Sequence, residues 1–227
     1  MSRAWMIAAA AAASCAPGDG PAAAPAQQPA ALNVPGGCST RAPRGGDAEG
    51  CFLAAVQRLG KMAPRPVYWH IYAYAGRAEA EAAADPLSIV VEAFERTWLY
   101  ALKPKGWHPR SGLRMAVLGP FPIRRGVDYT ARYMQATFSP GMKTGVHAHS
   151  GPEAWYVVSG AQCLQMPDQT LVVRAGEGAV VPEGPPMVLS SVGQEMRRSV
   201  LLVLHETNRP WTMVRHDWHP EASCPAA

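Results

Sequence analysis

The pattern of apolar and polar residues is most regular between residues 126 and 207. Short runs of β-branched and aromatic residues recur there, separated by turns rich in Gly, Pro and Asp, as in small barrels and sandwiches. This layout predicts a two-sheet jelly roll with a ligand cavity between the sheets. The expected strands are 127–138, 146–149, 153–159, 161–166, 169–173, 179–181, 187–191 and 198–205.

Residues 51–125 mix helical and extended patterns, which indicates a small α+β unit before the barrel. Apolar residues recur at helical spacing over 89–101, after an Asp-Pro start signal, and predict a helix. The β-branched run 89–91 leaves a strand as the alternative. The other expected helices are 51–56 and 77–84, and the expected strands are 67–74 and 112–118.

The first 50 residues have the composition of an export signal followed by a tether. Arg3 precedes an apolar stretch and then small residues, which is typical of a signal peptide over 1–24. The run ending at Cys15 resembles a bacterial lipoprotein cleavage site, so lipidation there would tether the protein to a membrane. Residues 25–50 have few large apolar side chains and predict a flexible tether. We therefore expect a periplasmic or membrane-anchored bacterial protein; an Ala-rich tail on a cytosolic protein, or an incorrectly assigned start codon, is the alternative.

The cysteine count agrees with export. Of five cysteines, loss or acylation of Cys15 leaves an even number that can form two disulfides outside the cytoplasm. A bridge between Cys38 and Cys51 would close a short loop. A bridge between Cys163 and Cys224 would tie the C-terminal tail to the barrel. Three pairings are open at this stage, and buried free thiols are the alternative.

Charge and motifs exclude several classes of function. The net charge is +4, but the basic residues are scattered and form no stripe with interleaved aromatic residues, so nucleic acid is a poor partner. No apolar run reaches the ~18 residues of a spanning helix. Hydrolase triad motifs, phosphate loops and dinucleotide fingerprints do not occur. A small-molecule ligand in the cavity of the jelly roll is the expected partner. The tail over 208–227 is expected to fold back over the body.

The strongest functional signal is a cluster of three residues. His147 and His149 alternate on one expected strand, so both imidazoles point to the same side. A tight turn over 150–152 would bring Glu153, on the next strand, to the same point. Two imidazoles and one carboxylate form a facial triad suited to a divalent metal with open coordination positions. A polar network without a metal is the alternative.

This cluster carries a family resemblance. The spacing H-x-H-x3-E, flanked by Gly141 and Gly160, resembles the first signature of the cupin superfamily, and the similarity extends over about 127–205. It implies a mainly β fold: a cupin-type jelly-roll β-barrel, here in a single-domain exported cupin with a small N-terminal α+β extension. It also implies a homodimer formed through barrel strands.

The second cupin signature, G-x5-P-x-G-x2-H-x3-N, is degenerate in this chain. Its glycines and proline are present, but Met187 stands at the histidine position and Ser191 at the asparagine position. In order of preference, the metal keeps three protein ligands, Met187 is an apolar plug, or its thioether is a soft ligand that favours copper. His205 is a candidate substitute for the fourth ligand, although a histidine hydrogen-bonded at the strand end is the simpler interpretation.

Three residues are candidates for a substrate pocket. Trp155 alternates with Glu153 and is expected to face the interior, where it would shape a pocket or pack in the core. Tyr133 and Gln135 share one face of the strand 127–138 and could donate a hydrogen bond to a substrate.

The combined reading is an exported cupin that binds one divalent metal through His147, His149 and Glu153 and acts on a small organic substrate. Iron, manganese, nickel, zinc and copper remain open as the metal. The resemblance implies a metal-dependent oxygenase or isomerase, among other reactions, and open coordination positions favour an oxygenase. The alternative is a non-catalytic small-molecule binding or sensing cupin with a weak or absent metal site.

Overall fold

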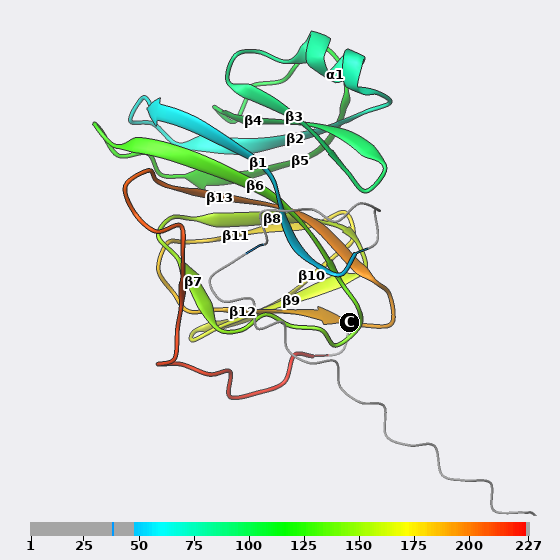
Figure 1. Ribbon diagram of the computed structural model, residues 1–227, viewed down its shortest axis with the longest axis vertical. Coiled ribbons are helices and arrows are strands. Elements are labelled where there is room, and N and C mark those ends of the chain that lie inside the picture. Colours follow the sequence, from blue (N-terminus) through cyan, green and yellow to red (C-terminus); the bar gives the residue numbers. More distant parts are fainter. Residues whose placement is uncertain (1–37, 39–47, 226–227) are drawn as a thin grey trace, which may run out of the picture.

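The structure is a computed structural model of the 227-residue chain, and it describes Cys38 and residues 48–225 (Figure 1). The expected signal peptide, most of the expected tether and the lipidation site Cys15 lie outside the described residues. Within the part of the chain that is described, no helix combines the length and the hydropathy needed to cross a membrane.

The centre of the molecule is a five-stranded antiparallel sheet, in the order β1-β6-β13-β8-β11. Its two faces pack against two other layers, as Figure 1 shows. The strands are β1 (Gly50–Lys61), β6 (Asp128–Phe138), β8 (Glu153–Ser159), β11 (Gly178–Val181) and β13 (Arg197–Glu206).

The second layer completes the jelly roll beneath the central sheet. It contains a three-stranded sheet in the order β10-β9-β12 and the pair β14-β7. These strands are β7 (His147–His149), β9 (Ala161–Met166), β10 (Gln169–Arg174), β12 (Val188–Val192) and β14 (Thr212–Val214). The expected mainly β jelly roll is confirmed, and the expected return of the tail is borne out by β14 and by the disulfide from Cys224 to Cys163.

The third layer is a four-stranded sheet, in the order β3-β4-β2-β5, that covers the opposite face of the central sheet. A short helix, α1 (Arg77–Ala83), packs on its outer side. The strands are β2 (Val67–Tyr74), β3 (Ser88–Ala93), β4 (Arg96–Lys103) and β5 (Leu113–Phe121).

Two of the expected helices are wrong. Residues 51–56 belong to β1, which pairs with β6 along its whole length, so this segment is part of the central sheet and not of the N-terminal extension. Residues 89–101 form β3 and β4, joined by a two-residue turn at Phe94 and Glu95 with φ values of 54° and 57°. Positive φ at both central residues is typical of a tight hairpin turn, although neither residue type usually marks one.

The helical periodicity of residues 89–101 has a simple explanation. β4 is buried on both faces, with Trp98 and Tyr100 toward the central sheet and Leu99 under α1. A strand buried on both faces is a nearly continuous apolar run, and such a run fits a period of 3.6 as well as a period of 2.

The two faces of the central sheet carry two separate cores. On β6, Tyr129, Ala131 and Tyr133 pack against the four-stranded sheet, whereas Met134, Ala136 and Phe138 face the interior of the jelly roll. β13 alternates in the same way, with Leu202 on the first side and Leu201 on the second. Because successive residues of a strand point to opposite faces, the register of the sheet decides which residues can reach the jelly-roll cavity.

Candidate metal centre

The two histidines lie on a strand that is held on both sides. β7 pairs with β14, and His147 also exchanges two backbone hydrogen bonds with Met187, of 3.1 and 2.8 Å. The Nδ1–H of His147 donates to the carbonyl oxygen of Gly145 at 3.0 Å, and the Nδ1–H of His149 donates to that of Trp211 at 2.9 Å. A carbonyl can only accept, so both rings carry the proton on Nδ1 and keep Nε2 as the ligating nitrogen.

Glu153 reaches the same point from the start of β8, where it pairs with Val181 and Val203. The turn before it passes close to β13: a Cβ atom on Gly151 would lie 2.0 Å from the carbonyl oxygen of Leu204. Only glycine allows this approach of two backbones. The turn therefore sets the position of the carboxylate relative to the two imidazoles.

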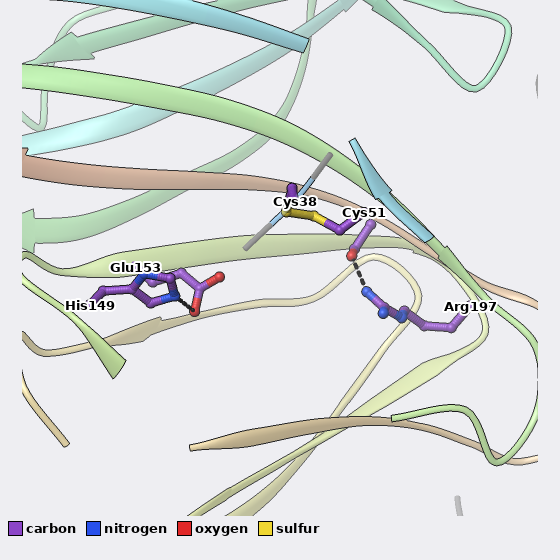
Figure 2. The surroundings of a disulfide bond; sticks show 6 residues. Cys38, Cys51, His149, Glu153 and Arg197 are labelled. Atoms are coloured by element: carbon purple, nitrogen blue, oxygen red, sulfur yellow. Dashed lines mark hydrogen bonds and ion pairs between the residues drawn. A yellow bond between two sulfur atoms is a disulfide. The ribbon is translucent and has the colours of Figure 1, made fainter. Parts of the chain in front are cut away.

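The three side chains converge. Their potential ligand atoms all lie within 4.8 Å of one another. His149 Nε2 and Glu153 Oε2 are 3.6 Å apart, beyond hydrogen-bond distance, and both atoms are buried without a hydrogen-bond partner (Figure 2). Buried polar atoms are almost always satisfied. A nitrogen and an oxygen that face each other unsatisfied are the arrangement that a shared cation fits.

Burial shifts the protonation of the cluster. It raises the pKa of Glu153 to about 8, against an opposing effect of Arg197. Burial, and secondarily the neighbouring His147, lowers the pKa of His149 to about 3. Burial also lowers the pKa of His147. Neutral imidazoles are the form that binds metal, and a buried carboxylate needs a nearby positive charge to ionise.

The side chains of the two candidates for a fourth ligand make other contacts in the structure. His205 uses both ring nitrogens elsewhere: Nε2 accepts from Arg132 Nε at 3.2 Å, and Nδ1–H donates to the carbonyl oxygen of Glu206 at 2.8 Å. Met187 is 1 % exposed and belongs to the apolar core of the jelly roll. His205 is therefore hydrogen-bonded near the end of β13, and the burial of Met187 in the apolar core favours the plug over a ligand.

A cavity of about 660 Å³ opens beside the cluster. Its walls are mostly apolar, and the disulfide Cys38–Cys51, which Figure 2 draws, borders it. The apolar lining residues include Met134, Ala136, Phe138, Leu189, Leu201 and Trp211.

The expected pocket role of Tyr133 and Gln135 is wrong. Both point away from the cavity, because the even-numbered residues of this part of β6 face it. Tyr133 instead stacks on Tyr100 of the four-stranded sheet, with ring centroids 5.3 Å apart, and donates to Gln57. Trp155 does face the jelly-roll interior, where it is fully buried in the core and does not line the cavity.

Sequence reasoning missed four charged or titratable residues that line the cavity. Arg197 lies at the start of β13 and lines the cavity, as do Arg215, His216 and His219 of the tail. A signal for Arg197 was present: counting back in steps of two from Leu201 along an inward-facing strand leads to it. The two tail histidines are exposed at the edge of the cavity, and only the return of the tail brings them there.

Comparison with known proteins gives the following relatives. The family model for the Cupin domain matches residues 134–203, which run from β6 to β13 and contain all three cluster residues. No curated protein matches the chain. Solved structures that resemble it include oxalate oxidase, with 25% identity over 37% of this chain and 45% of that chain and a TM-score of 0.33.

Two further structures resemble the same region. A cupin-like protein from Thermotoga maritima is 18% identical over 32% of this chain and 55% of that chain, with a TM-score of 0.31. A structure of the DMSP lyases RdDddP and RnDddQII is 18% identical over 38% of this chain and 44% of that chain, with a TM-score of 0.34. The match thus spans about half of each of these proteins. Residues 134–203 therefore form a cupin domain, and the jelly-roll sheets agree with the expected resemblance to the cupin superfamily.

Proposed function

We propose that this protein is an exported cupin that holds one divalent metal ion through His147, His149 and Glu153 and acts on a small organic substrate in the adjoining cavity. One observation carries the proposal: buried His149 Nε2 and Glu153 Oε2 face each other at 3.6 Å with no hydrogen-bond partner. A divalent cation between them would satisfy both atoms and compensate the charge of the carboxylate.

The surroundings of the cluster support metal binding over a polar network. In a network, the histidines and the carboxylate would hydrogen-bond one another. Instead, both Nδ1–H groups are held by backbone carbonyls, which orients Nε2 as in metal-ligating histidines. Trp211 also stacks on His149, with ring centroids 5.8 Å apart and an angle of 17°, and limits rotation of that ring.

When bound, the ion would supply a Lewis acid or an oxygen-binding centre. The chain contributes a mostly apolar cavity beside the cluster, where a small organic substrate can bury its carbon atoms. Three protein ligands leave coordination positions open, so oxygenase-type chemistry is the first reaction to test.

Export is supported by the two disulfides, Cys38–Cys51 and Cys163–Cys224. Disulfides persist in oxidising compartments and are rare in the cytoplasm. The expected signal sequence would carry the chain to such a compartment, where lipidation at Cys15 would retain it at a membrane.

The experiment is metal analysis by mass spectrometry of untagged protein purified from the exported fraction. We expect nearly one equivalent of a transition metal in the wild type and almost none in a His147→Ala, His149→Ala double variant. A His216→Ala, His219→Ala double variant is the matched control, because it removes two cavity histidines outside the cluster. Equal metal content in all three proteins, or none in any after reconstitution, would refute the metal site.

A non-catalytic binding cupin remains the second candidate, because Met187 stands where the family's second signature has a metal-ligating histidine. Glu153→Gln separates the two functions. In an enzyme this variant abolishes turnover of the substrate, whereas in a binding module it only weakens retention of the ligand.

A further inference from the structure

Arg197 is a buried cation that does not belong to the cluster of His147, His149 and Glu153. It lies at the start of β13, is 1 % exposed and lines the same cavity as His147, His149 and Glu153. Its guanidinium carbon lies 3.9 Å from the ring centroid of Phe138, and Nη1 donates to Ser199 Oγ. These two contacts hold the guanidinium plane in one orientation, shown in Figure 2.

The other donors of this guanidinium have no acceptor. Nε and Nη2 are buried without a hydrogen-bond partner, and no Asp or Glu among the described residues forms an ion pair with Arg197. Glu153 influences it only electrostatically, and Figure 2 shows the two side chains extending toward each other with no ion pair between them. An unpaired buried charge is strongly destabilising, so a missing counter-charge is the simplest account of its place in the cavity.

The geometry of the free donors specifies the chemistry of the missing group. Nε–H and one Nη2–H lie side by side on a single edge of the guanidinium, and this edge matches the two oxygens of a carboxylate. The other cationic side chain of the cavity, Arg215, is already paired with Asp217. Among the Arg and Lys side chains that the structure describes around this cavity, Arg197 thus supplies the one uncompensated positive charge, which a carboxylate would balance.

The walls of the cavity indicate the chemistry of the rest of the ligand. Phe138 lies against Arg197, and Met134 and Leu201 line the same cavity; all three offer apolar contact and no hydrogen bonds from their side chains. A ligand with a carbon body and one charged end would therefore bury its body against these walls.

We propose that Arg197 anchors the carboxylate of the substrate, and that the cavity accepts a small monocarboxylic acid with an apolar body. Arg197 and the three-residue cluster line one cavity, so an acid held by its carboxylate presents its carbon body to the cluster. This inference rests on the proposed function for the reaction, but not for the binding of the acid.

The test is calorimetric titration of the metal-loaded, disulfide-bonded protein with matched pairs of probes: hexanoate and hexanamide, and benzoate and benzamide. We expect at least one acid to bind and its amide to bind roughly 100-fold more weakly, because two charge-assisted hydrogen bonds are lost. Arg197→Gln should weaken the binding of the acid by the same factor and leave the binding of the amide unchanged. Inorganic phosphate should bind more weakly than the acid.

Two further variants make the result specific. Arg198→Gln is the matched control, because Arg198 is the next residue of β13, points to the other face and does not line the cavity. Arg197→Lys keeps the charge but lacks the two-donor edge, so its loss of acid binding should be intermediate. It also keeps the test valid if Arg197→Gln fails to fold.

Metal content of each variant distinguishes failure of this inference from failure of the metal site. Metal-containing wild type whose acid binding is unchanged by Arg197→Gln would overturn the anchor and leave the metal site standing. Metal-free wild type that still binds acids through Arg197 would uphold the anchor and refute the metal site. Loss of metal from Arg197→Gln would show that Arg197 serves only as a counter-charge for Glu153. Absence of acid binding by the wild type would also overturn the proposal.

Discussion

Glu153→Gln should stabilise the metal-free protein and destabilise the metal-loaded one. In the metal-free protein, burial raises the pKa of this carboxyl from 4.5 to about 8. The folded state therefore holds a proton that the unfolded chain releases between these two values. The free energy of unfolding of the metal-free wild type is unaffected below pH 4.5 and falls as the pH rises toward 8. The loss is about 3 kcal/mol at pH 7 and about 5 kcal/mol in total. Glutamine has nearly the same shape and no charge, so it removes this loss.

The assay is thermal unfolding of chelator-treated wild type and variant between pH 4.5 and 8.5. We expect the variant to melt roughly 6–12 °C higher at pH 7 and to show a flatter pH dependence. Adding the divalent metal should reverse the order, because only the carboxylate binds it well. Glu195→Gln, at an exposed position, is the control and should change neither curve. A variant less stable than wild type without metal, or an unchanged pH dependence, would refute this account of the cluster.

Three further predictions follow from the same geometry. Met187→His should raise metal affinity at least about tenfold if this position can reach the cluster. The affinity is measured by competition with a chelator, and an unchanged value would place residue 187 outside the reach of the metal. Gly151→Ala should lower stability by more than about 2 kcal/mol and reduce metal content, because its Cβ would meet the backbone of β13 at 2.0 Å, whereas Gly106→Ala, with open space around it, should not. Cys163→Ser with Cys224→Ser should cost about 4 kcal/mol of unfolding free energy in denaturant titrations, since the bridge spans 61 residues, and a loss below about 1 kcal/mol would contradict it.

The cluster of His147, His149 and Glu153 could be predicted from sequence because its geometry is local. His147 and His149 share a face by strand alternation, and one tight turn brings Glu153 back to them. All three residues lie within seven positions of the chain, so their convergence depends little on how the rest of the molecule packs. The jelly-roll strands were predictable for a similar reason, since their alternation and turns are encoded within each segment.

The errors all concern segments whose environment is set by a distant layer. β4 is apolar on both sides because α1 covers one face and the central sheet the other, so its pattern could not distinguish strand from helix. Tyr133 shares a strand with cavity residues, but the four-stranded sheet takes the face on which it lies. Neither neighbour could be inferred from the residues themselves.

Residue types and spacing by themselves determined the jelly-roll strands, the three converging side chains and the pool of cysteines for two disulfides. Only the tertiary structure decided which face of β6 borders the cavity, which cysteines pair, and that Arg197 projects into the cavity with an unsatisfied edge. The physical reason is the separation along the chain over which each effect acts. Alternation and turns act within a few residues, whereas burial, pairing and charge compensation depend on contacts between segments far apart in the chain.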